Sequence, residues 1–274
     1  NTSNFTPSDP TGAVGPNHYV AAWNAGFKIF DKEGNELVPE ASLGSLFDGN
    51  NAGDPIVLYD APADRFIITQ FENEEESTDE NEFVNGLNIA VCQGSDPVND
   101  GWYIYTAGFE TGEFPDYPKY SVWHDGYYIT ANIRTGDERT GDAIFVMERE
   151  KMLQGLTDVG FIGFPLPTLQ TNGFYSPQFF NISSPNAPTT GGATVVYYQD
   201  DSWSGVAEDH LKLWTVDIDW NTPTNSSISQ PDVIPVTDFN GVFDGGSFSN
   251  LPQPSGPDID ALQGTVMNQA QFRK

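Results

Sequence analysis

The sequence GDPIVLYDAPADRFIITQF, residues 53–71, has the pattern of two β-strands joined by a tight turn. Residues 55–59 form a short apolar run, residues 60–64 combine a proline with small and acidic turn formers, and residues 65–71 are apolar again and partly β-branched. This pattern predicts a β-hairpin. Pro55 suits the start of the first strand, because proline lacks an amide donor and is tolerated there.

The same arrangement recurs at three other places in the chain. Each copy has a polar residue, a proline, an apolar strand, a turn and a second apolar strand. The prolines at the strand starts are Pro10, Pro55, Pro118 and Pro177, which are 45, 63 and 59 residues apart. Repeats near this length, with several strands in each, are typical of the blades of a β-propeller. A β-sandwich whose strands begin after proline is the alternative fold.

The sequence therefore predicts an all-β protein built from four-stranded antiparallel blades, with residues 1–274 forming a single β-propeller region. The expected blades cover residues 11–46, 54–108, 117–167 and 177–239. A short helical turn is expected at the end of the third blade's third strand, where a glycine closes the pattern EKMLQG.

The C-terminal residues should begin a fifth blade and stop in its second strand. An unfinished propeller would leave sheet edges and apolar faces unpaired. We therefore expect the chain to be a fragment of a longer, multidomain protein.

Composition fits this fold and excludes several classes of partner. The chain has 13 % aromatic residues, 27 glycines and 20 prolines, as stacked and turn-rich sheets require. Its formal net charge of −28 argues against nucleic acid, whose phosphates need lysine and arginine. The same charge argues against anionic membranes and acidic polysaccharides unless cations bridge them. No apolar run is long enough for direct membrane insertion.

An acidic segment interrupts the second expected blade. Residues 72–82, ENEEESTDENE, carry seven carboxylates. A segment this polar cannot pack in a core, so we expect a protruding solvated loop, with cation binding as the alternative.

Catalytic motifs are scarce. The single cysteine, Cys92, falls in an apolar strand pattern and is predicted to be structural. The three histidines, His18, His124 and His210, fall in three different expected blades without the spacing of a metal site. No nucleophile elbow, phosphate-binding loop or dinucleotide fingerprint is present. The sequence assigns no catalytic residue and favours a protein that is not an enzyme.

Five aspartates are the candidate metal ligands. Asp9, Asp54 and Asp116 stand at or just before the first strand of successive expected blades, so in a propeller they can converge near the central channel. There they could hold calcium, which prefers several hard oxygen ligands, or act as the carboxyl pair of a glycosidase. Alternatively, each accepts hydrogen bonds from amides at its own strand entry. Asp200 and Asp201 belong to another acidic turn and form a second calcium candidate.

Three segments and their order resemble a known family. The segments are DPTGAVGPNHYVAAWNAGFKIFDKEGN, GDPIVLYDAPADRFIITQF and YPKYSVWHDGYYITANI. They resemble large secreted or cell-surface β-propeller proteins of Bacteroidota and related environmental bacteria, and the resemblance covers nearly the whole chain. It implies a β-propeller fold, an extracellular or outer-surface location and contact with secretion or outer-membrane machinery. It implies no particular activity.

Two functional hypotheses follow. The first is a non-catalytic extracellular propeller module that binds a protein or glycan surface ligand, in adhesion or as the cargo of a secretion system. The second is a polysaccharide-active enzyme of the glycoside hydrolase type that uses channel carboxylates. In that case Tyr117, Trp123 and Tyr175 would be platforms for sugar rings, although core packing is the competing explanation for aromatics on strands. The enzyme would need two carboxylates about 5–10 Å apart in a cleft.

Overall fold

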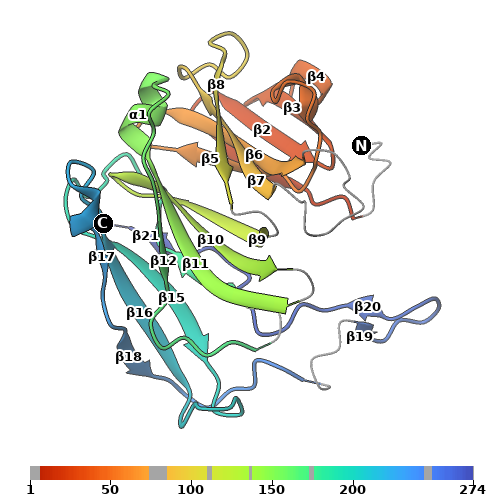
Figure 1. The fold of residues 1–274 in the computed structure, drawn as a ribbon. Helices are drawn as coiled ribbons and strands as arrows, with labels where there is room; N and C mark the ends of the chain where they lie inside the picture. Colours follow the sequence, from red (N-terminus) through yellow and green to blue (C-terminus); the bar gives the residue numbers. More distant parts are fainter. Residues whose placement is uncertain are drawn as a thin grey trace.

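The computed structural model describes residues 7–73, 85–109, 113–135, 138–172, 176–243 and 249–273. The regular secondary structure of this part of the chain is almost entirely β-strand, as predicted. Its main units are three four-stranded sheets and one five-stranded sheet (Figure 1). Each main sheet is antiparallel and is formed by one stretch of the chain. Most of the acidic loop expected at residues 72–82 lies outside the described residues.

The first sheet contains β1 (Thr11–Val14), β2 (His18–Trp23), β3 (Gly26–Asp31) and β4 (Glu36–Ser42). These strands pair in chain order, so the sheet is a simple meander. The turn between β3 and β4 is held by the Asp31 carboxylate, which accepts hydrogen bonds from the amides of Glu33 and Asn35. A 3₁₀ turn, η1 (Leu43–Ser45), follows the last strand.

The second sheet contains β5 (Ile56–Asp60), β6 (Arg65–Asn73), β7 (Asn85–Cys92) and β8 (Trp102–Gly108). Strands β5 and β6 form the hairpin that the repeated sequence pattern predicts, with Asp60 opposite Arg65 at the turn. The Asp60 carboxylate accepts a hydrogen bond from the Ala63 amide at 3.1 Å, which closes that turn.

The third sheet contains β9 (Glu113–Val122), β10 (Gly126–Thr135), β11 (Glu138–Glu148) and β12 (Phe161–Pro165). The helix α1 (Arg149–Gln154) stands between β11 and β12, where a helical turn was predicted. It ends at Gly155, whose φ of 72° is left-handed and is therefore easy only for glycine. Within the described residues no helix is long and apolar enough to cross a membrane.

The fourth sheet contains β13 (Gln178–Phe179), β15 (Ala193–Gln199), β16 (His210–Asp217), β17 (Ser227–Ile228) and β18 (Asp232–Pro235). Strand β16 pairs with β17 at one end and with β18 at the other, so two short strands share the outer position of this sheet. The 3₁₀ turn η2 (Pro223–Asn225) leads into β17.

The C-terminal region differs from the expected start of a fifth blade. Strand β21 (Gln271–Phe272) pairs in parallel with β14 (Asn181–Ile182), far back in the chain. Strands β19 (Ser249–Leu251) and β20 (Ile259–Asp260) form an isolated pair. The described residues after β18 therefore form two-stranded contacts and no fifth four-stranded sheet.

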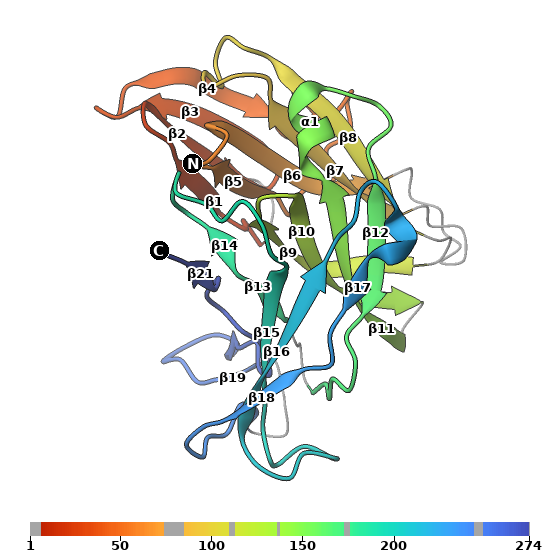
Figure 2. The same cartoon turned by 90° about the vertical axis from the view of Figure 1, so that its left-hand side faces the viewer.

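Three hydrophobic cores lie between successive sheets. Val20 and Ile29 of the first sheet pack with Ile68 of the second. Further cores join the second sheet to the third and the third to the fourth. Successive residues of a strand point to opposite faces, and in a central sheet such as the third both faces are buried, so that Tyr127 belongs to one core and Tyr128 to the next. The result is a series of four stacked sheets, which Figure 2 shows from the side.

A buried ion pair ties the second sheet to the third. The Asp60 carboxylate is 0 % exposed. It accepts hydrogen bonds from Arg149 Nε at 2.6 Å, Arg149 Nη2 at 2.9 Å and the Tyr127 hydroxyl at 2.9 Å. A bidentate guanidinium is the geometry that best offsets the cost of burying a carboxylate. The β5–β6 turn is therefore fixed to the start of α1.

Candidate functional site

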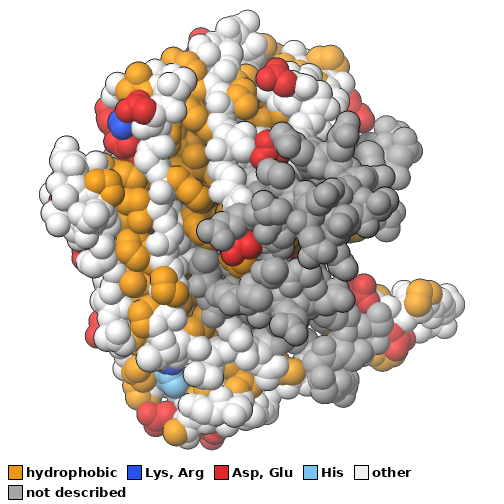
Figure 3. All heavy atoms as spheres, in the orientation of Figure 1, with side chains coloured by type: hydrophobic (Ala, Val, Ile, Leu, Met, Phe, Trp, Pro, Cys, Tyr) orange, Lys and Arg blue, Asp and Glu red, His pale blue; other side chains and the backbone are white. Residues whose placement is uncertain are grey.

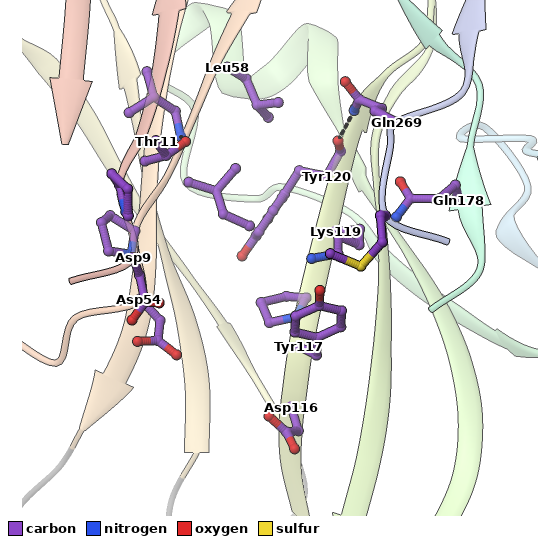
Figure 4. A pocket seen from close by; sticks show the side chains of 16 residues that line it. Asp9, Thr11, Asp54, Leu58, Asp116, Tyr117, Lys119, Tyr120, Gln178 and Gln269 are labelled. Carbon is purple, nitrogen blue, oxygen red and sulfur yellow. Dashed lines mark hydrogen bonds between the residues drawn. The ribbon is translucent and has the colours of Figure 1, made fainter. Parts of the chain in front are cut away.

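A pocket of about 590 Å³ lies where the first strands of the four sheets approach one another (Figure 4). Strand β5 contacts β1 and β9, and β9 contacts β13. Residues at the starts of β1, β5 and β13 line the pocket together with residues 116–120 in the middle of β9, and the C-terminal segment adds Met267 and Gln269. Because the first strand of each sheet carries the same pattern of polar residue and proline, at or near its start, equivalent positions from different sheets meet here.

Asp9 and Asp54 form a carboxyl pair at one side of the pocket. Asn24 links them, since its Nδ2 donates to Asp9 Oδ2 at 2.6 Å and to Asp54 Oδ1 at 3.2 Å. The Asn24 Oδ1 in turn accepts a hydrogen bond from the Asp54 amide at 2.5 Å. Burial raises the pKa of Asp9, and the charge and hydrogen bond of Asp54 raise it further. Asp9 therefore holds a proton more readily than an isolated carboxylate does.

The backbone at the strand starts has positive φ angles. Asp9 has a φ of 38°, Asp54 of 48° and Tyr117 of 53°, and each of the three immediately precedes a proline. Residues other than glycine rarely adopt this conformation. Strain of this kind is often found at functional sites, and here it occurs in three residues that line one pocket.

Asp116 and Tyr117 contribute to the opposite side of the pocket. Both belong to β9, and Figure 4 shows Asp116 facing the pocket across from Asp9 and Asp54. The pairing of β9 with β10 shifts register just beyond Asp116, between Thr130 and Asn132 of β10. An irregularity of this kind changes the direction in which strand side chains point, and such irregularities are common near active sites.

Lys119 points into the pocket from the same strand. Its Nζ lies 3.4 Å from the centroid of the Tyr117 ring, which is a cation–π contact. Burial lowers the pKa of Lys119 to about 8. Among the ion pairs of the described residues, none involves Lys119, so no nearby carboxylate offsets the removal of this ammonium group from water.

Amide and phenol groups complete the inner wall. Gln269 Nε2 donates to the Tyr120 carbonyl at 2.5 Å and to Ser121 Oγ at 3.2 Å, which fastens the C-terminal segment to β9. Gln178 Nε2 donates to the Val266 carbonyl at 3.2 Å. The Tyr120 hydroxyl is buried in the same wall.

The three aromatic residues considered as sugar platforms occupy different places in the structure. Tyr117 lines the pocket. Trp123 is only 5 % exposed, its Nε1 donates to the Gly191 carbonyl at 3.0 Å, and its ring packs edge-on against Phe272. It belongs to the core between the third and fourth sheets, away from the pocket lining. Tyr175 lies outside the described residues.

Asp200 and Asp201 lie apart from the pocket, in the turn between β15 and β16. With Asp209 they form the one group in the described chain whose ligand atoms all lie within 4.8 Å of one another and could hold a metal ion. Their carboxylates also stabilise the surrounding loops. The Asp200 carboxylate accepts hydrogen bonds from the amides of Ser202 and Gly241 at 2.8 and 2.5 Å. Asp209 accepts from the amides of Asp201 and Phe239 at 2.7 and 2.5 Å, so the group also holds the β15–β16 turn against the loop after β18.

The histidines and the cysteine show no shared site among the described residues. His124 Nε2 lies 2.9 Å from the Gly191 carbonyl, and His210 Nδ1 lies 2.7 Å from the Glu208 carbonyl. His18 Nε2 is 3.8 Å from Asp96. Cys92 is buried in the core between the first two sheets, and burial raises the pKa of its thiol, which makes it a poor nucleophile.

The sequence analysis missed four residues of the pocket region. Asn24, Lys119, Gln178 and Gln269 are ordinary polar residues in the sequence, and no motif marks them. Lys119 and Gln178 each follow directly after a strand-starting proline. The repeated pattern could therefore have identified these two, whereas Asn24 and Gln269 reach the site only through tertiary contacts.

Comparisons with known proteins give distant structural similarity and nothing closer. No family model matches the chain, and no curated protein matches it. An α-L-arabinofuranosidase from Lactobacillus brevis is similar in structure over 82 % of this chain and 73 % of its own, with 14 % identity and a TM-score of 0.43. A candidate glycoside hydrolase from Parabacteroides distasonis covers 96 % and 79 %, with 10 % identity and a TM-score of 0.37. At this distance the two similarities bear on neither activity nor substrate.

Proposed function

We propose that the four sheets are successive blades of a β-propeller and that the pocket lies on its central axis. Each sheet begins with a strand that reaches the pocket, and neighbouring sheets pack face to face. Both features are expected of blades arranged around a channel, because the first strand of each blade is the innermost one.

We propose further that the pocket binds a carbohydrate and hydrolyses its glycosidic bond. The observation that carries this proposal is the placement of the Asp9–Asp54 pair and Asp116 on facing walls of one pocket. A volume of about 590 Å³ is in the usual range for small-ligand sites. Glycoside hydrolysis needs one carboxyl that keeps a proton and one that is ionised. Asp9, with its raised pKa, suits the first role. We assign the second role to Asp116 because it is the carboxyl that β9 brings to the same pocket.

The reaction would proceed by general acid and base catalysis. Asp9 would give its proton to the leaving glycosidic oxygen as the bond from that oxygen to the anomeric carbon breaks. A water molecule would add to the anomeric carbon and pass its proton to the Asp116 carboxylate. Asn24 holds Asp9 and Asp54 in place through its two hydrogen bonds, and Asp54 keeps the pKa of Asp9 high by its negative charge.

Hydrolysis can be tested with a panel of nitrophenyl glycosides. We expect release of nitrophenol from at least one glycoside, with a loss of roughly 10²–10⁴-fold in rate for Asp9→Asn and for Asp116→Asn, the range for removing a general acid or base. Asp158→Asn, at an exposed ion pair outside the pocket, should keep full activity. Melting temperatures of all variants control for folding.

The absence of turnover on the whole panel would contradict the proposed hydrolase activity. So would equal activity in the wild-type protein and both pocket variants.

A non-catalytic binding module of an exported protein is the second candidate. It is favoured by the hydrogen bonds from Asn24 to Asp9 and Asp54, which give these carboxylates a structural purpose of their own. In that case the pocket or the loops would bind a protein or glycan ligand at the outer cell surface or outside the cell. The net charge of −28 suits such a location, since it keeps a protein soluble. Glycan binding without turnover would select this candidate.

Calcium is the cation we propose for the group of Asp200, Asp201 and Asp209. Its hard oxygen ligands are the kind that calcium prefers. A carboxylate oxygen that accepts one amide hydrogen bond keeps a second lone pair, so capping and cation binding are compatible. Asp201 is exposed, and the charge of Asp209 raises its pKa, which a bound cation would reverse.

A further inference from the structure

The pocket is lined by three aspartates and one lysine. Asp9 and Asp54 come from the starts of β1 and β5, whereas Asp116 and Lys119 both enter from β9 (Figure 4). Among the described residues that line the pocket, Lys119 is the one basic residue. A ligand that fills this pocket therefore meets carboxylates from both walls and a single cation on the β9 wall.

Lys119 is arranged to receive a negative group. Its ammonium is held over the Tyr117 ring, which fixes its position without neutralising its charge. It forms no ion pair with a described residue, although burial has removed much of its water. A buried cation without a partner is costly, and a ligand anion would supply that partner through charge-assisted hydrogen bonds.

The inner wall also carries a phenol hydroxyl. The Tyr120 hydroxyl is buried in the lining. Thr69 lies within reach of it, and Thr69 Oγ1 can accept from this hydroxyl while it donates to the Ile56 carbonyl at 3.5 Å. The hydroxyl is therefore a secondary feature of the lining, and the inference depends on Lys119.

We propose that the pocket selects sugars that carry a carboxylate, that is, hexuronic acids, with the carboxylate at Lys119 and the ring hydroxyls toward the aspartates. This inference rests on the proposed carbohydrate site. A carboxylate fits better than a phosphate or sulfate ester, because phosphate sites usually gather several donors such as arginine forks, and this pocket offers one lysine among three aspartates.

The overall charge of the chain limits the size of the ligand. At −28 the protein repels a long polyuronate, whereas a short uronide brings a single carboxylate, which Lys119 can pair, into a pocket that also holds three aspartates. Short uronides should consequently bind better, per sugar unit, than the polymer.

Binding of matched sugars tests the proposal. The methyl glycosides of glucuronic and galacturonic acid are compared by calorimetry at pH 7 with methyl glucoside and methyl galactoside. At least one uronide should bind about 10-fold or more tightly than its neutral counterpart, the range for a hydrogen bond to a charged group. Lys119→Met, which keeps an unbranched side chain and removes the ammonium group, should abolish that preference. Lys28→Met, at an exposed ion pair with Glu36 on the first sheet, should retain it.

A second readout follows the lysine itself. The lysines are ¹³C-methylated, and the NMR signal of Lys119 is identified because Lys119→Met lacks it. This signal should titrate near pH 8 in the free protein. A bound uronide should move the titration to higher pH.

The outcomes separate the inference from the proposed hydrolysis. Uronide preference with no turnover keeps this inference and removes the hydrolase. Turnover of neutral glycosides without any preference removes this inference alone. A preference that survives in Lys119→Met, or the absence of any sugar binding, overturns it.

Discussion

Lys119 shows at the scale of one residue how a binding pocket can cost stability. Its pKa of about 8 in the folded protein lies below its ordinary value of 10.5, so folding favours the neutral form. Below pH 8 the lysine is charged in both states, and the folded protein bears the full cost of the buried charge. Lys119→Met should therefore raise the free energy of unfolding at pH 7 by about 2 kcal/mol, allowing for partial exposure.

The sign of the pH dependence follows from the same pKa. Between pH 8 and 10.5 the unfolded chain binds more protons at this position, so the wild-type protein gains stability as the pH rises. The advantage of Lys119→Met should accordingly be smaller at pH 9.5 than at pH 7 in urea unfolding. An advantage independent of pH, or a loss of stability at pH 7, would contradict a desolvated ammonium. Lys28→Met should not show this pattern.

At the scale of elements, the junction between the second and third sheets depends on one buried ion pair. Arg149 at the start of α1 makes two hydrogen bonds to Asp60 at the end of β5. Removing one partner leaves an uncompensated buried charge, so Arg149→Met should lower the free energy of unfolding by about 3–5 kcal/mol. Chemical denaturation measures this loss. Lys151→Met, which removes only exposed ion pairs on the same helix, should have little effect.

A double variant distinguishes the ion pair from simple packing. Combining Arg149→Met with Asp60→Leu removes both charges, and apolar replacements of buried ion pairs are often close to neutral. The double variant should recover a good part of the lost stability. If the two losses add instead, shape complementarity at this junction matters more than charge.

At the scale of the whole molecule, the net charge of −28 dominates. On the face shown in Figure 3, the described acidic side chains lie at several separate places. Repulsion among them destabilises the compact state and is screened by salt. Sodium chloride should therefore raise the melting temperature between about 10 mM and 1 M, over which the Debye length falls from about 30 to 3 Å. A melting temperature that is flat or falls over this range would contradict charge repulsion as a main opposing force.

Calcium chloride at matched ionic strength separates screening from specific binding. An additional rise that disappears on adding a chelator, and in Asp201→Asn, would place calcium at the group of Asp200, Asp201 and Asp209, because a cation bound to the folded state alone stabilises it. Identical sodium and calcium curves would leave these aspartates with their capping role only.

Local patterns in the sequence were enough to find the strands. Short apolar runs bounded by turn formers predicted the hairpin of β5 (Ile56–Asp60) and β6 (Arg65–Asn73), because such a run directly reports a buried strand. The helical turn before Gly155 was found for a similar reason, since glycine readily takes the left-handed angle there. The parallel pairing of β14 with β21 was not foreseeable, because no local signal links segments so far apart.

The candidate site was only partly visible in the sequence. The residues at the strand starts predicted that Asp9, Asp54 and Asp116 could converge, and the structure brings all three to one pocket. Trp123 was a sugar platform only in the enzyme hypothesis, with core packing as the competing explanation, and the structure places it in the core. The sequence alone could not decide between the two, because alternation gives the face of a strand but not what lies against that face.

The sequence by itself thus determined the all-β class, the strands and the acidic character of this protein, since these depend on neighbouring residues and on composition. The tertiary structure alone decided that Asn24 joins Asp9 to Asp54, and that Lys119, which stands over Tyr117 two residues before it on the same strand, has no acidic ion-pair partner in the described chain. The link from Asn24 to Asp54 and the surroundings of Lys119 depend on how the sheets pack and not on any residue's neighbours in the chain.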